Sequence, residues 1–148
     1  LLWRLLERPE RWQTMLADQS LIPQAIEESL RFDPPVLGLY RNTTEDVVIH
    51  GQTIPASSKV YLHYAAANRD PIVFPNPDEF DIGRPAQRHM SFGLGVHFCL
   101  GATTARLEAE VALRVLLDRI PDLRLIGSGE RIGPFFLWGR KKLPLAWA

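Results

Sequence analysis

The residue best suited to do chemistry is Cys99, the only cysteine of the chain. It follows a loop punctuated by Gly93 and Gly95 and comes just before a long stretch with helical periodicity. Alternate glycines permit backbone conformations that other residues avoid, and they let a flat ligand approach closely. The free N–H groups at a helix start favour an anionic side chain, so Cys99 is placed to act as a thiolate nucleophile or a metal ligand.

Several interpretations of Cys99 stay open on these residues alone. Cysteine is often buried and inert, which requires no chemistry. A nucleophilic cysteine would need a base such as His97 or His63, but no sequence signature supplies a residue to orient that base. Zinc is a weaker alternative, because one cysteine and four scattered histidines show no paired ligand spacing. Ligation of haem iron suits the neighbours Phe92 and Phe98, whose rings favour an apolar macrocycle.

The elements that position this loop follow from periodicity and from proline. Residues 1–32 predict three helices separated at prolines, and the Asp-Pro-Pro run at 33–35 ends the third of them. Short apolar runs over 36–62 predict small strands joined by polar turns. The proline-rich stretch at 69–91 predicts a long loop, since prolines exclude regular helix and central strand.

The cysteine loop at 92–101 leads into the longest predicted helix, over 100–120. In that helix Leu107, Val111 and Val115 form a row four residues apart, which predicts the apolar side of the helix. Residues 121–148 predict a terminal hairpin. The sequence therefore predicts a mainly α fold with small β-sheets.

Composition narrows the class of protein. The chain has 148 residues, of which 46% are hydrophobic and 23% charged, as in a globular domain. Seventeen basic and seventeen acidic residues cancel, which argues against nucleic-acid binding. No apolar run long enough for a membrane span is evident, nor a signal peptide. The chain starts at Leu1 rather than Met, within an uncapped amphipathic helix, so we expect a piece of a longer protein.

Residues 92–101 resemble the haem-binding signature of the cytochrome P450 family, F-G-x-G-x-H-x-C-x-G, and match it at all six defined positions. The run Glu28-Ser29-Leu30-Arg31 resembles the E-x-x-R of the family's K helix. The segments at 68–71 and 80–84 resemble its meander, and the helix at 100–120 resembles its L helix. By this resemblance, which is strongest to soluble bacterial members, residues 1–148 form the C-terminal part of a single P450 domain.

The resemblance implies a haem b cofactor, iron protoporphyrin IX, with Cys99 as the axial iron ligand. Positions that match the family's haem contacts are Arg41, Phe92, Gly93, His97 and Gly101. Of these, Arg41 and His97 match positions beside the haem propionates, and arginine is the usual partner of a carboxylate.

The resemblance also implies roles for two further sets of residues. Glu28, Arg31 and Arg84 would form a buried acid–arginine–arginine cluster that locks the meander to the K helix, a task that suits planar guanidinium groups. Substrate-lining positions of the family match Val36, Leu37, Leu39, Phe136 and Leu137. The same residues could equally be ordinary core, because apolar lining and core packing look alike in sequence.

The function implied is that of a cytoplasmic haem-thiolate monooxygenase, which inserts one oxygen atom from O2 into a small apolar organic substrate. Its electrons would come from a ferredoxin-like or flavin-containing donor, and Arg88, Arg106 and Arg114 near the cysteine loop would steer an acidic partner. The family's oxygen-activating residues lie upstream of residue 1. We therefore expect no catalytic residue here beyond the iron ligand, and no activity from the chain alone.

Two alternatives remain on the sequence. The first is a non-catalytic haem-binding or degenerate P450 fragment, which a full-length reading frame upstream would argue against. The second is a P450-like peroxygenase or isomerase, which would share the cysteine.

Overall fold

The computed structural model describes residues 1–133 and 136–148. Its helices are α1 (Leu2–Leu6), α2 (Pro9–Ala17), α3 (Ile22–Phe32), α4 (Tyr64–Ala67) and α5 (Ala102–Arg119), with short 3-10 turns η1 (Gln19–Leu21) and η2 (Gly95–His97). Prolines lie in the first turns of α2 and α3, where the missing N–H would have had no helical partner. The long helix predicted over 100–120 thus spans Ala102–Arg119.

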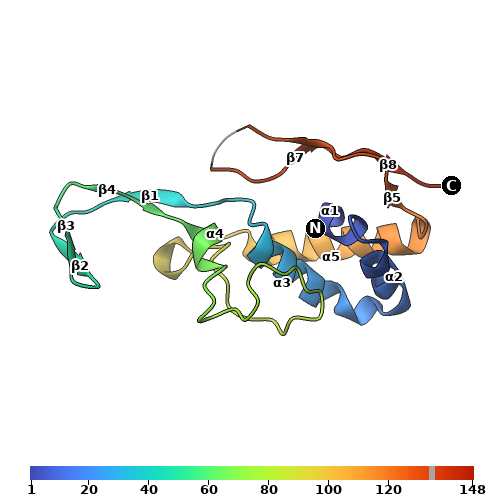
Figure 1. Ribbon diagram of the computed structural model, residues 1–148, viewed down its shortest axis with the longest axis horizontal. Helices are drawn as coiled ribbons and strands as arrows, with labels where there is room; N and C mark the ends of the chain where they lie inside the picture. Colours follow the sequence, from blue (N-terminus) through green and yellow to red (C-terminus); the bar gives the residue numbers. More distant parts are fainter. Residues whose placement is uncertain (134–135) are drawn as a thin grey trace.

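The strands pair two by two, and every pair is antiparallel. β1 (Leu39–Asn42) pairs with β4 (Lys59–Leu62), and β2 (Val47–Ile49) pairs with β3 (Gln52–Ile54). Near the C-terminus β5 (Arg124–Leu125) pairs with β8 (Leu145–Ala146), and β6 (Glu130–Arg131) pairs with β7 (Arg140–Lys142). The β1–β4 ribbon and the β2–β3 hairpin extend away from the helices at one end of the molecule (Figure 1). The prediction of a mainly α fold with small sheets is confirmed.

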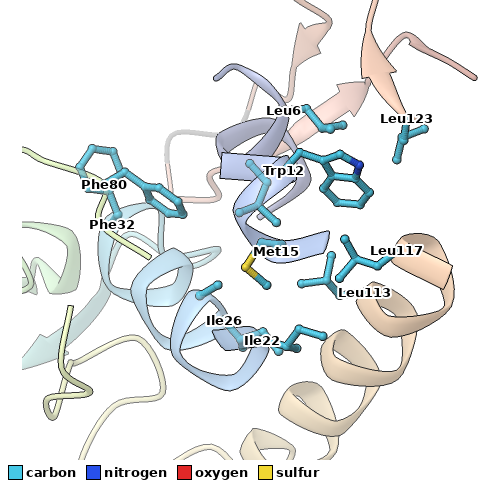
Figure 2. Packing of buried hydrophobic residues seen from close by; sticks show 12 residues of the cluster. Leu6, Trp12, Met15, Ile22, Ile26, Phe32, Phe80, Leu113, Leu117 and Leu123 are labelled. Carbon is cyan, nitrogen blue, oxygen red and sulfur yellow. The ribbon is translucent and has the colours of Figure 1, made fainter. Parts of the chain in front are cut away.

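The hydrophobic core lies among α1, α2, α3 and α5 (Figure 2). Trp12 sits at its centre with 2% of its surface exposed, and its indole Nε1–H donates to the carbonyl oxygen of Pro121 at 2.8 Å. Met15 and Ile22 pack from α2 and α3, and Leu117 packs from α5. A buried indole needs a partner for its N–H, so this hydrogen bond joins the start of the chain to the residues that follow α5.

The apolar row predicted on the long helix, now α5, does not lie on the face of α5 that packs against α3. Leu113 and Leu117 face the core with 1% and 2% exposure, whereas Leu107, Val111 and Val115 are 52–58% exposed. The reason is that α5 carries two apolar stripes, and the helices of this chain cover only one of them. The second stripe continues toward the cysteine loop as exposed apolar surface.

Residues 69–91 contain neither helix nor strand in the structure. Within the described part of the chain, no helix is long and apolar enough to cross a membrane.

Candidate functional site

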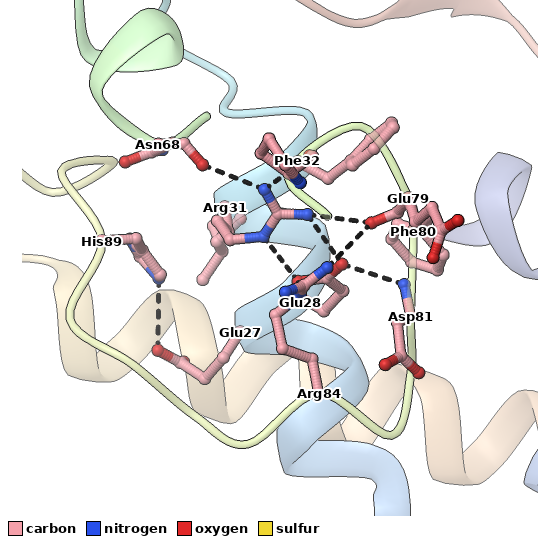
Figure 3. Close-up of polar contacts among 12 residues, drawn as sticks. Glu27, Glu28, Arg31, Phe32, Asn68, Glu79, Phe80, Asp81, Arg84 and His89 are labelled. Carbon is pink, nitrogen blue, oxygen red and sulfur yellow. Dashed lines mark hydrogen bonds and ion pairs between the residues drawn. The ribbon is translucent and has the colours of Figure 1, made fainter. Parts of the chain in front are cut away.

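The side chain of Arg31 is at the centre of a buried polar cluster (Figure 3). It is 2% exposed, and its Nε and Nη2 donate to the two carboxylate oxygens of Glu28 at 2.7 and 2.8 Å. Its remaining hydrogens point to backbone carbonyls, those of Asn68 and Pro77 at 2.9 Å and that of Glu79 at 3.0 Å. All five guanidinium N–H groups are therefore satisfied, as a buried charge requires.

Glu28 and Arg84 complete this arrangement, which we call the arginine cluster (Glu28, Arg31 and Arg84). Glu28 Oε1 also accepts the backbone N–H of Asp81 at 2.9 Å, and Arg84 Nε lies 3.1 Å from Glu28 Oε2. Arg84 further donates to the carbonyls of Pro75 and Asn76 at 2.6 and 3.0 Å. The structure thus brings the three residues together, and their acceptors tie the proline-rich loop to α3.

The cysteine loop closes on itself through backbone hydrogen bonds. The N–H of Cys99 donates to the carbonyl of Phe92 at 2.9 Å, and the N–H of Phe98 donates to that of Gly95 at 3.0 Å. Gly93 and Gly95 have φ of 69° and 66°, the left-handed region that glycine reaches without strain. Helix α5 begins three residues after Cys99 rather than at it, and the Cys99 side chain is exposed.

An apolar hollow of about 270 Å³ opens beside Cys99. Its lining comes from α3 and the segment after it, from α4, and from the cysteine loop with the residue before it: Leu30, Pro35, Val36, Leu39, Tyr64, Ser91, Phe92, Gly93, His97 and Cys99. Cys99 therefore lies at the edge of a mostly apolar cavity. Among the described residues, no group of three or more His, Cys, Asp or Glu side chains could hold a metal ion.

Two other predicted site residues, Leu37 and Arg41, do not line this hollow. Leu37 follows Val36 but borders a separate hollow with Ala65 and Arg69, because neighbours along extended backbone point to opposite sides. Arg41 is half-buried in β1 and donates to the carbonyl of Tyr40.

The remaining predicted positions are placed by backbone contacts. Gly101 caps α5. Leu137 forms a β-bridge with Val36, and the Phe136 carbonyl accepts the N–H of Leu37 at 2.8 Å, so the two predicted lining segments lie side by side.

The expected cationic surface near Cys99 is mostly neutralised. Arg106 forms a two-pronged ion pair with Glu27, and Arg114 pairs with Glu110 at 2.9 Å. Arg88 is exposed and has no hydrogen bond or ion pair with any residue that the structure describes. The proposed steering of an acidic partner therefore falls on Arg88 rather than on all three arginines.

Sequence reasoning missed a second polar cluster, the Glu27 network (Glu27, His89 and Arg106). Glu27 Oε1 and Oε2 accept from Arg106 Nε and Nη2 at 2.5 and 2.9 Å, and His89 Nε2 lies 3.2 Å from Oε2. Burial acts to raise the pKa of Glu27, but the close contacts with His89 and Arg106 outweigh it and lower that pKa to about 2. The partners lie far from Glu27 in sequence, so no local spacing could have signalled them.

This lowered pKa predicts a loss of stability in acid. A carboxylate whose folded pKa is below its ordinary value of 4.5 adds stability above pH 4.5, and that stability disappears as the pH falls toward 2. We expect Glu27→Gln to lower the free energy of unfolding at pH 7 by about 2 to 3 kcal/mol and to flatten its pH dependence between about 5 and 2. Urea unfolding at several pH values measures this. Parallel curves for the parent and Glu27→Gln across that range would contradict it, and Glu110→Gln, at the more exposed ion pair with Arg114, is the control.

Known proteins match this chain over the part that carries the arginine cluster and the cysteine loop. The family model of cytochrome P450 matches residues 7–120, which is most of the chain. The biotin biosynthesis cytochrome P450 of Bacillus subtilis is 46% identical over 132 residues, covering 89% of this chain and 33% of the relative. Cytochrome P450-SU2 of Streptomyces griseolus is 44% identical over 147 residues, covering 97% and 36%.

Among solved structures, that of P450BioI in complex with hexadec-9Z-enoic acid ligated acyl carrier protein superposes with a TM-score of 0.96 at 41% identity. The matched region covers 99% of this chain and 38% of the neighbour's chain. The chain thus spans about a third of the length of the curated relatives that it matches. The matched residues reach from just after α1 to the end of α5, and the signature cysteine is exposed at an apolar hollow, so the chain belongs to the cytochrome P450 family.

Proposed function

We propose that this chain supplies the cysteine-bearing part of a haem-thiolate monooxygenase that inserts one oxygen atom from O2 into an apolar organic substrate. The observation that supports it best is the exposed Cys99 thiol at the edge of an apolar hollow. Thiolate is the iron ligand of P450 enzymes. The fatty-acyl ligand of one structural neighbour supports an apolar substrate.

The residues present fit a haem. Cys99 offers the only thiol of the chain, and the walls around it are mostly apolar, as a macrocycle requires. Gly93 lies in this wall with a φ of +69°, a backbone conformation that side chains rarely adopt, which favours glycine at this position. Haem supplies the oxygen chemistry when it is bound.

The chain's own residues hold and orient the group. Cys99 would bind the iron, and the hydrogen bond from its N–H to the Phe92 carbonyl would hold the backbone that carries the thiol. His97 and Arg41 would contact the propionates, since both carry N–H donors suited to carboxylates. Val36 and Leu39 would exclude water from the cavity and offer apolar surface to the substrate.

Electrons would reach this site from a ferredoxin-like or flavin-containing protein that docks on the face around Cys99. Arg88 precedes the cysteine loop in sequence, is exposed, and has no hydrogen bond or ion pair among the described residues. We expect Arg88→Glu to slow reduction by an acidic donor, with the difference from the parent shrinking as salt rises, because charge steering is screened. Stopped-flow reduction at several ionic strengths tests this, and equal rates at low salt would remove Arg88 from the docking surface.

The exposed apolar surface supports a role within a larger protein. Leu107, Val111 and Val115 on α5 are more than half exposed, as are Val96 and Leu100 in the cysteine loop. Surface of this kind usually packs against another segment.

We therefore expect the 148-residue chain alone to bind haem weakly and to catalyse no O2-dependent oxidation. Titration of haem into the purified chain, followed by absorption spectroscopy, measures binding. A stoichiometric thiolate-type complex with monooxygenase activity would show that this chain is sufficient by itself.

The experiment that decides the proposal is the absorption spectrum of the reduced, carbon monoxide-bound protein, recorded on the full-length protein that contains this chain. A thiolate-type Soret band supports haem-thiolate ligation. Turnover of an apolar substrate with O2 and an electron donor then separates a monooxygenase from a non-catalytic haem-binding protein.

A further inference from the structure

We propose that the Glu27 network (Glu27, His89 and Arg106) positions Phe92 and, through it, the backbone that presents Cys99. These are positioning residues, since none of them lines the hollow beside Cys99. The inference rests on the proposed function in one respect only, that Cys99 is the iron ligand. Its structural part concerns the shape of the loop and stands without a cofactor.

The network joins three segments that are distant in sequence. Glu27 lies on α3, Arg106 on the first turns of α5, and His89 in the residues that lead into the cysteine loop. Arg106 pairs with both carboxylate oxygens of Glu27, which fixes the plane of its guanidinium group. Figure 3 shows His89 directed at the Glu27 carboxylate.

His89 is held in one orientation by its two ring nitrogens. Its Nδ1 accepts the backbone N–H of Ser91 at 3.2 Å, which leaves the ring proton on Nε2. Nε2 is buried, and Glu27 Oε2 is its nearest partner at 3.2 Å, although the alignment falls short of a hydrogen bond. His89 therefore contacts the Glu27 carboxylate through one ring nitrogen and the backbone N–H of Ser91, the residue before Phe92, through the other.

Two members of the network, Arg106 and His89, contact the Phe92 ring. The guanidinium of Arg106 lies over the Phe92 ring, 4.6 Å from its centroid, and the His89 ring lies 6.1 Å from it. Phe98 approaches the Phe92 ring edge-on at 6.4 Å. A cation stacked on an aromatic face is attracted by the ring quadrupole, so Arg106 holds the ring while Glu27 holds Arg106.

Phe92 passes this constraint to the ligand residue through its backbone. Its carbonyl oxygen accepts the N–H of Cys99 at 2.9 Å, the bond that closes the cysteine loop. A shift of the Phe92 ring moves that carbonyl, and with it the Cys99 backbone. The predicted consequence of breaking the network is a looser loop and a less secure thiolate ligand, with the rest of the fold retained.

The chain offers a matched control for this idea. Arg114 lies on the same helix, forms the same kind of ion pair with Glu110 at 2.9 Å, and has no ring contact with Phe92. Arg106 and Arg114 side chains are also similarly exposed, at 36% and 44%. Arg106→Ala and Glu27→Gln are therefore compared with Arg114→Ala and Glu110→Gln in the full-length protein.

Two measurements distinguish a specific effect of the network on the cysteine loop from a general loss of fold stability. We expect amide hydrogen exchange in residues 92–101 to rise about tenfold in Arg106→Ala and Glu27→Gln and to stay near the parent in both controls. The thiolate-type fraction of the reduced, carbon monoxide-bound spectrum should decay faster in the same two variants. Arg106→Lys keeps the charge but loses the planar stack, so it should fall between Arg106→Ala and the parent.

Equal loop exchange and equal spectral decay in Arg106→Ala and Arg114→Ala would overturn the proposal. If Arg106→Ala fails to fold, the comparison of Arg106→Lys with Arg114→Lys decides in the same way. A parent protein without a thiolate signature would refute the proposed function instead, while the exchange data would still decide whether the network shapes the loop.

Discussion

Cys99→Ser should abolish the thiolate-type Soret band of the reduced, carbon monoxide-bound protein while most of the fold survives. Cys99 is the only cysteine of the chain, so no neighbouring thiol within it can take over as ligand. Its side chain is exposed in this structure, and replacing one exposed small side chain by another changes the free energy of unfolding by about 0.5 kcal/mol or less. The spectrum should therefore change far more than the stability.

The measurement pairs the absorption spectrum with a thermal unfolding curve on the same sample. His97→Gln is a useful companion, because His97 lines the same hollow but would contact only the propionates. We expect that variant to bind haem less tightly and to retain the thiolate-type band. An unchanged spectrum in Cys99→Ser would rule out Cys99 as the iron ligand.

Arg31→Lys should be among the most destabilising conservative substitutions in the chain, at about 3 to 5 kcal/mol. Lysine has three donors in place of five and cannot reproduce the planar fork that grips both oxygens of Glu28. It would leave carbonyls such as those of Asn68 and Pro77 without their donor in a buried site. The loop over 69–91 should then detach from α3.

Chemical unfolding of the full-length protein measures the stability loss, and limited proteolysis within 69–91 reports the detachment. Arg114→Lys, on the exposed side of α5, should change stability by less than about 0.5 kcal/mol. A similar small change in Arg31→Lys would mean that the arginine cluster contributes little to holding the loop.

The sequence predicted those elements whose signals are local. Periodicity and proline placement located α2 and α3, and the loop signature located Cys99 and the glycines with positive φ. The three-residue spacing of Glu28 and Arg31 predicted that they share a helix face. The backbone acceptors of Arg31 could not be predicted, because a carbonyl is present at every residue and carries no signature.

The Glu27–Arg106 ion pair and the buried stripe of α5 depend on tertiary contacts that residue spacing in the sequence does not indicate. Glu27 meets Arg106 across 79 residues of sequence, and only the packing of α3 against α5 brings them together. Periodicity likewise identified apolar residues on α5 without indicating which stripe faces the core. Leu113 and Leu117 are buried because α2 and α3 lie on their side, whereas Val111 is not covered by this chain.

The hydrogen bond from Trp12 to the Pro121 carbonyl has a consequence for the order of events during synthesis. Its two ends are 109 residues apart, and the Trp138 indole reaches Asp33 across 105 residues. Within this chain, α1 and α2 therefore emerge from the ribosome long before the residues that complete their core. Contacts of such high sequence separation form slowly, since loop closure must come first. A nascent chain stalled before α5 would expose Trp12 and Met15, and would be the species that chaperones and proteases meet.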